Sequence, residues 1–237
     1  MKKDIFVEGH RGYCAKYPEN TLISYEGAMS VRDKVALKTL SFLLCTIGCY
    51  LLLWQLLSRG LDLPVYYYGR LIECLGLLLF IALAIATPMR FEEMGIVTGK
   101  RTLFCSLALG GGVALTVFAS LAALAALRGT DPLFSWYVRG DISHVTYFLV
   151  APLQEILAKS VMYYGFELCF GREHHHLVNL MSALTFAIFH VAYGIEMMVP
   201  AMALTLLTGW IFHRYRSVWG CALAHFAFGF FPVCFGF

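Results

Sequence analysis

The polar residues of this 237-residue chain that could do chemistry lie inside three strongly apolar segments. The first segment carries Gln154, Glu155 and Lys159, and two later segments carry one histidine each, His190 and His225. An ionisable group at the centre of a bilayer costs roughly 2.5–3.5 kcal/mol on insertion scales, so such groups usually face a bundle interior and serve a function. We therefore expect the three segments to converge on one buried polar site.

These residue types suit two kinds of chemistry. A carboxylate and imidazoles can activate water and stabilise the oxyanion during hydrolysis of an amide bond. Glu155, His190 and His225 could instead hold a divalent metal such as zinc with one coordination position left open. A purely structural alternative is also open, because Glu155 and Lys159 are spaced i, i+4 and could form an ion pair on one helix face.

The composition is that of a membrane protein. Hydrophobic residues make up 59% of the chain and charged residues 14%, whereas soluble domains have about 25% charged residues. The net charge is only +3, and no basic patch is interleaved with aromatic residues, so we expect no nucleic-acid partner. The eight cysteines include no Cys-x-x-Cys pair, which argues against a disulfide framework and a cysteine zinc site.

Seven apolar stretches follow a polar N-terminal segment, residues 1–36. Each approaches or exceeds the ~20 residues that a helix needs to cross a bilayer. Their hydrophobic runs are continuous rather than alternating, which favours helices over a membrane barrel. We predict an all-α polytopic membrane protein with about seven transmembrane helices, at residues 37–57, 71–87, 102–127, 142–169, 177–193, 195–212 and 218–235.

The distribution of basic residues predicts the orientation in the membrane. The N-terminal segment and the loops on its side of the membrane hold twelve Lys and Arg residues, against four on the opposite side. The positive-inside rule then places the N-terminus in the cytoplasm. Glu73, near the start of the second span, is expected to snorkel to the membrane surface.

The N-terminal segment resembles the opening of glycerophosphodiester phosphodiesterases over residues 4–29. The matching sequences are HRG at 10–12 and PENT at 18–21. In that family the positions of His10 and Glu19 serve acid/base catalysis and metal binding. The barrel of those enzymes takes about 250 residues, which the segment lacks, so we expect no independent domain and no phosphodiesterase activity.

The three polar segments together resemble the CPBP family, the CAAX-protease and bacteriocin-processing intramembrane endopeptidases. The family pattern is EExxxR on one span, FxxxH on the next and HxxxN near the end. Here these read QEILAK at 154–159, FAIFH at 186–190 and HFAFG at 225–229. The resemblance covers residues 37–237 and implies a glutamate-dependent endopeptidase in a bacterial plasma membrane. Its partners would be the lipid bilayer and a peptide or lipidated protein, which activated water cleaves.

The resemblance also implies roles for single residues. The first glutamate position of the family, here Gln154, activates water, and His190 and His225 position that water and stabilise the oxyanion. Glu155 is the second glutamate of the motif, and Phe186 begins the second motif.

The chain departs from the family pattern at three positions. Gln154 is a neutral amide and cannot accept a proton from water, and loss of a base typically costs about 10²–10⁴ in rate. Lys159 keeps the charge of the motif arginine but loses its bidentate fork. Gly229 removes an oxyanion donor, worth about 10²–10³ in rate. Two alternatives therefore stay open: a non-catalytic membrane scaffold or bacteriocin-immunity protein of the same fold, and a transporter with a buried Glu/His relay.

Overall fold

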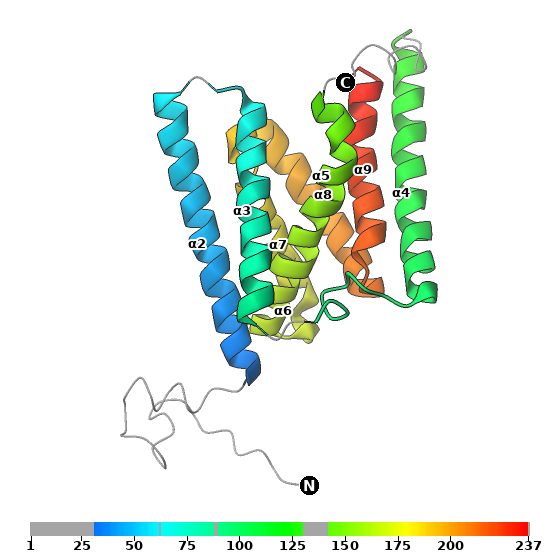
Figure 1. The fold of residues 1–237 in the computed structure, drawn as a ribbon. Helices are drawn as coiled ribbons and strands as arrows, with labels where there is room; N and C mark the ends of the chain where they lie inside the picture. The colour runs from blue at the N-terminus through cyan, green and yellow to red at the C-terminus, as the bar shows by residue number, and fades with distance from the viewer. Residues whose placement is uncertain (1–30, 62, 88–89, 130–141, 237) are drawn as a thin grey trace, which may run out of the picture.

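Helices provide all the regular structure in the part of the chain that the structure, a computed structural model, describes: residues 31–61, 63–87, 90–129 and 142–236 (Figure 1). The phosphodiesterase-like residues 4–29 lie outside these ranges. In chain order the helical segments are α2 (Val31–Gly60), α3 (Val65–Ala86), α4 (Lys100–Leu127), α5 (Ile142–Glu155), the π-helical η2 (Ile156–Tyr163), α6 (Tyr164–Phe170), the 3-10 turn η3 (Arg172–His174), α7 (His175–Ile188), the 3-10 turn η4 (Val191–Tyr193), α8 (Ile195–Tyr215) and α9 (Val218–Cys234).

The prediction of an all-α membrane protein is confirmed. Four of the described helices, α2, α3, α4 and α8, are long and apolar enough to cross a bilayer, and α9 is a shorter apolar helix. The predicted span at 142–169 is one continuous helical run made of α5, η2 and α6. Each predicted stretch contains helical structure, because backbone groups in lipid must be satisfied within the segment.

One predicted span is wrong in its extent. The stretch 177–193 does not form a single helix, since α7 already ends at Ile188 and the chain turns through η4 before Gly194. Gly194 has a φ of 81°, a left-handed backbone conformation that favours glycine, and α8 begins directly after it. His190 therefore lies just beyond a helix end rather than inside a helix.

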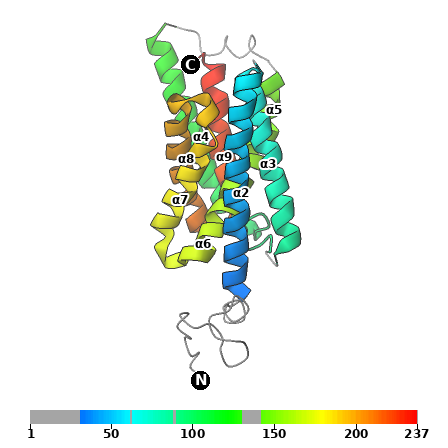
Figure 2. The same cartoon turned by 90° about the vertical axis from the view of Figure 1, so that its left-hand side faces the viewer.

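The helices form a bundle in which the elements carrying the predicted site residues are central. α2 and α3 stand at one side and α4 at the other, with α5, α7, α8 and α9 between them (Figures 1 and 2). α9 packs against both α4 and α5, α7 packs against α8, and α3 reaches α5, η2 and η4. The position of α9 between α4 and α5 thus decides where His225 lies.

The described part of the connection between α3 and α4, residues 90–99, is hydrogen-bonded to η2 and to the start of α9. The Ser160 hydroxyl donates to the Met94 carbonyl at 2.8 Å, and the Val218 N–H donates to the Gly95 carbonyl at 3.0 Å. Gly95 has a φ of 74°, so the turn depends on glycine there. These bonds tie the π-helical segment η2 and the start of α9 to the same short loop.

Candidate active site

The helical run through α5 and η2 changes its winding where it carries the site residues. Pro152 lies inside α5 and has no N–H to donate to the preceding turn. From Ile156 to Tyr163 the backbone is π-helical, a form that is rare and often found at functional sites. Gln154 and Glu155 lie immediately before this change and Lys159 lies within it.

Glu155 is held in a fully buried polar network. Its Oε1 lies 2.8 Å from Nδ1 of His225, and its Oε2 lies 3.8 Å from Nζ of Lys159. Lys159 also donates to the Thr205 carbonyl of α8 at 3.0 Å. Neither Glu155 nor Lys159 is exposed to solvent. The network thereby joins α5, η2, α8 and α9 and fixes the orientation of the His225 ring.

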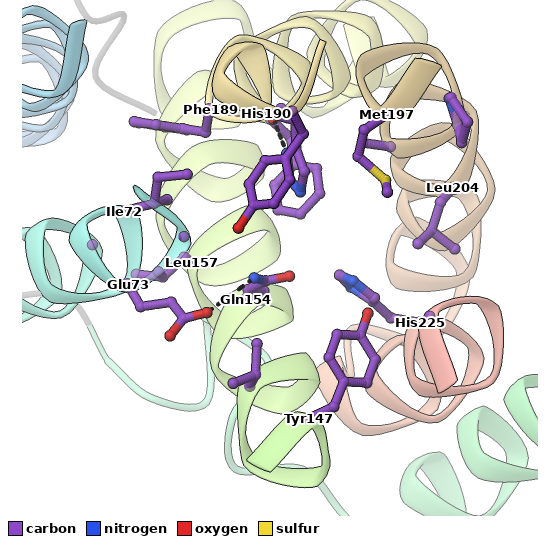
Figure 3. A pocket seen from close by; sticks show the side chains of 18 of the residues that line it. Ile72, Glu73, Tyr147, Gln154, Leu157, Phe189, His190, Met197, Leu204 and His225 are labelled. Carbon is purple, nitrogen blue, oxygen red and sulfur yellow. Dashed lines mark hydrogen bonds between the residues drawn. The ribbon is translucent and has the colours of Figure 1, made fainter. Parts of the chain in front are cut away.

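A cavity of about 500 Å³ lies in front of this network. Gln154, His190 and His225 line it, and Figure 3 shows the three side chains around the same space. Glu155 does not line the cavity, because it lies behind His225. The structure thus brings Gln154 and both histidines to one site and gives Glu155 contact with that site through His225.

His190 owes its orientation to the end of α7. Its Nδ1 donates to the Phe186 carbonyl at 2.8 Å, one of the carbonyls that a helix end leaves without an intrahelical partner. With the proton on Nδ1, Nε2 of His190 is the acceptor of the ring. The Phe186 ring lies 4.7 Å from the His190 ring and 5.9 Å from that of His225, so it packs against both imidazoles.

The cavity also holds a carboxylate that the sequence interpretation did not select. Glu73 is only 8% exposed and lines the cavity from α3, so the expectation that it snorkels to the membrane surface is wrong. Gln154 donates to its Oε1 at 3.3 Å, and Arg70 lies 2.8 Å from the same oxygen. The sequence could have pointed to Glu73, because an ionisable residue inside an apolar span is by default a candidate functional residue.

The described residues contain no group of three His, Cys, Asp or Glu side chains arranged to hold a metal ion. Glu155, His190 and His225, the expected zinc ligands, do not form such a group. Glu155 directs Oε1 at Nδ1 of His225, whereas His190 uses its own Nδ1 on a backbone carbonyl. No chemical step is therefore assigned to a metal.

Gly229 lines the cavity next to Tyr147 of α5. A Cβ added at Gly229 would overlap the ring and the hydroxyl of Tyr147, and the Tyr147 ring lies 6.2 Å from the ring of His225. The tyrosine thus takes the space in which the motif asparagine would stand. Figure 3 shows its hydroxyl on the cavity side, beside His225.

We expect Gly229→Ala to destabilise the protein by about 1–3 kcal/mol, because the added methyl overpacks the contact with Tyr147. In a Tyr147→Ala background the same substitution should cost nothing. Unfolding in detergent, followed by circular dichroism, measures both values. Gly48→Ala in α2 is the matched control, since a Cβ there meets nothing within 4 Å. Equal costs in the two backgrounds would contradict the contact.

The comparison with protein families gave a match. Residues 142–231 match the family model described as Type II CAAX prenyl endopeptidase Rce1-like. The matched region runs from the start of α5 into α9 and contains all three motif segments. Neither the comparison with curated proteins nor that with solved structures found a match. Over residues 142–231 the chain is therefore similar to the Rce1-like family of type II CAAX prenyl endopeptidases.

Proposed function

We propose that the chain is an intramembrane endopeptidase that cleaves a peptide or a lipidated protein substrate with activated water. The observation that carries this proposal is the cavity lined by Gln154, His190 and His225. Side chains such as Leu79, Leu157, Phe189 and Leu204 form much of the remaining wall. An apolar wall around a few convergent polar groups is typical of a ligand site and would suit a prenyl chain.

The two histidines have orientations that fit this chemistry. The carboxylate of Glu155 accepts a hydrogen bond from His225 Nδ1, and the Phe186 carbonyl accepts one from His190 Nδ1. Each ring then has Nε2 left for water or substrate. The Gln154 amide can donate a hydrogen bond to an oxyanion, but it cannot accept a proton from water. Water activation therefore falls to another group.

We expect His190→Ala to reduce cleavage of a farnesylated Cys-aliphatic-aliphatic-X peptide by about 10²–10³, the usual cost of losing one group that stabilises the transition state. The assay uses the full chain in detergent micelles and follows the released tripeptide. His176→Ala is the matched control, because His176 is exposed and does not line the cavity. If the wild type and His190→Ala cleave equally, the histidine has no catalytic role and the proposal fails.

A non-catalytic function is favoured by one observation, the amide at position 154 beside a glycine at position 229. A membrane scaffold or a bacteriocin-immunity protein would keep the cavity and need no base. In that case the wild type would bind the farnesylated peptide without cleaving it. A bacterial plasma membrane and a cytoplasmic N-terminus are part of the proposal. The orientation rests on the excess of basic residues on one side of the membrane.

A further inference from the structure

We propose that Glu73 is the general base of this site and takes the role that Gln154 cannot perform. The inference rests on the proposed endopeptidase function and deepens it. It assigns water activation to a residue of α3, which lies outside the matched region 142–231. The reaction would then use a carboxylate from a different helix than the one that carries the QEILAK motif.

The first argument is the placement of Glu73 itself. It lies in an apolar helix, is nearly buried, and lines the same cavity as both histidines. Among the described residues, no other Asp or Glu side chain lines this cavity. A carboxylate in such a position is costly unless it has a use or is fully paired.

The second argument is the direct contact between Glu73 and Gln154. The amide Nε2 of Gln154 donates to Oε1 of Glu73 at 3.3 Å, so the two side chains meet at the motif position (Figure 3). A glutamate at position 154 would place two carboxylates within hydrogen-bond distance, where both cannot readily ionise. The glutamine at 154 and the glutamate at 73 are therefore a compatible pair, because one side chain is an amide that donates and the other a carboxylate that accepts.

The third argument is how the carboxylate is held. Arg70 lies 2.8 Å from Oε1, the same oxygen that accepts from Gln154. The described residues place no hydrogen bond or ion pair on Oε2 of Glu73. One oxygen is thus used to fix the side chain, and the other is left to accept a proton.

The proposed step balances as an ordinary amide hydrolysis. Glu73 takes a proton from water while the water oxygen forms a bond to the scissile carbonyl carbon, and the carbonyl π electrons move to the oxygen. When the tetrahedral intermediate collapses, the C=O bond re-forms and the C–N bond breaks. Protonated Glu73 returns its proton to the leaving nitrogen. The products are a carboxylic acid and an amine, and the Glu73 carboxylate is regenerated.

The test compares cleavage of the farnesylated peptide by four full-length forms: wild type, Glu73→Gln, Gln154→Glu and the exchange variant Glu73→Gln/Gln154→Glu. We expect Glu73→Gln to lose about 10²–10⁴ of the rate, the usual contribution of a general base. The exchange variant should recover to within about tenfold of wild type, because it again holds one carboxylate and one amide. Glu92→Gln, an exposed residue of the loop after α3, is the control with unchanged rate.

The pH profile gives a second readout that a purely structural role would not move. A carboxylate base must be ionised, so the wild-type rate should fall as the pH is lowered through its pKa, and the residual rate of Glu73→Gln should lack that limb. Unchanged cleavage by Glu73→Gln would overturn the assignment and leave the proposed function standing. An exchange variant or Gln154→Glu that cleaves when the wild type does not would overturn both the assignment of Glu73 and the proposed function of the wild-type chain. If no form cleaves the peptide, the proposed function itself fails.

Discussion

Replacing Lys159 by methionine should destabilise the protein by about 3–5 kcal/mol, because it leaves the Glu155 carboxylate buried without its cation. The Lys159 ammonium lies 3.8 Å from Glu155 Oε2, and neither side chain is exposed to solvent. Methionine has a similar volume, so the loss would reflect charge and not a cavity. The measurement is the free energy of unfolding in detergent.

Two companion variants separate charge from packing. Lys159→Met/Glu155→Gln removes both charges and should recover much of the lost stability, since no uncompensated ion remains. Lys34→Met, an exposed position near the start of α2, is the matched control and should change stability by less than about 0.5 kcal/mol. A loss at Lys159 no larger than that of the control would mean that the pair does not hold this part of the bundle.

The sequence predicted well those features that depend on local patterns. Continuous apolar runs marked the helices, because lipid leaves the backbone few alternatives. The i, i+4 spacing placed Glu155 and Lys159 on one face, and the structure has them paired even though the π-helical segment begins between them. The family resemblance rested on the same local motifs, which is why the match to residues 142–231 confirms it.

The features that escaped prediction depend on contacts between distant segments. Glu73 and Gln154 are hydrogen-bonded although they lie 81 residues apart in the sequence. Residue spacing cannot predict that α3 packs against α5. From the sequence, Gly229 was interpreted only as the loss of an oxyanion donor. In the structure the side chain of Tyr147 occupies the space beside it. The end of α7 before His190 was also missed, because the apolar pattern continues past the point where the backbone turns.

The helices α4 and α9 approach each other closely along a seam formed by Ser106, Gly110 and Gly220. An added Cβ at Gly110 would overlap the Gly220 carbonyl, and one at Gly220 would overlap the backbone and hydroxyl of Ser106. The Gly220 N–H also donates to the Ser106 hydroxyl at 3.2 Å. Small residues permit such close approach, which is the usual basis of helix association in lipid. No rotamer change can relieve the overlap, since backbone atoms stand on both sides.

We expect Gly220→Ala to destabilise the protein by about 1–3 kcal/mol through overpacking, with a further loss of about 0.5–1.5 kcal/mol for the Ser106 hydrogen bond. Gly112→Ala in α4 is the control, because a Cβ there meets nothing within 4 Å and alanine favours a helix. The measurement compares the free energies of unfolding of both variants in detergent with that of the wild type. Equal stability of the two variants would show that α4 and α9 do not approach as closely as this seam requires.

The same substitution should also reduce peptide cleavage, although Gly220 lies outside the cavity. α9 carries His225, and its packing against α4 and α5 determines whether Nδ1 stays 2.8 Å from Glu155. A shift of about 1 Å in a positioned group can cost about 10² in rate. A kcat that falls in Gly220→Ala under conditions where the variant remains folded would therefore identify the glycine seam as the support of His225, to which we assign a catalytic role. A kcat equal to wild type would limit the seam to stability alone.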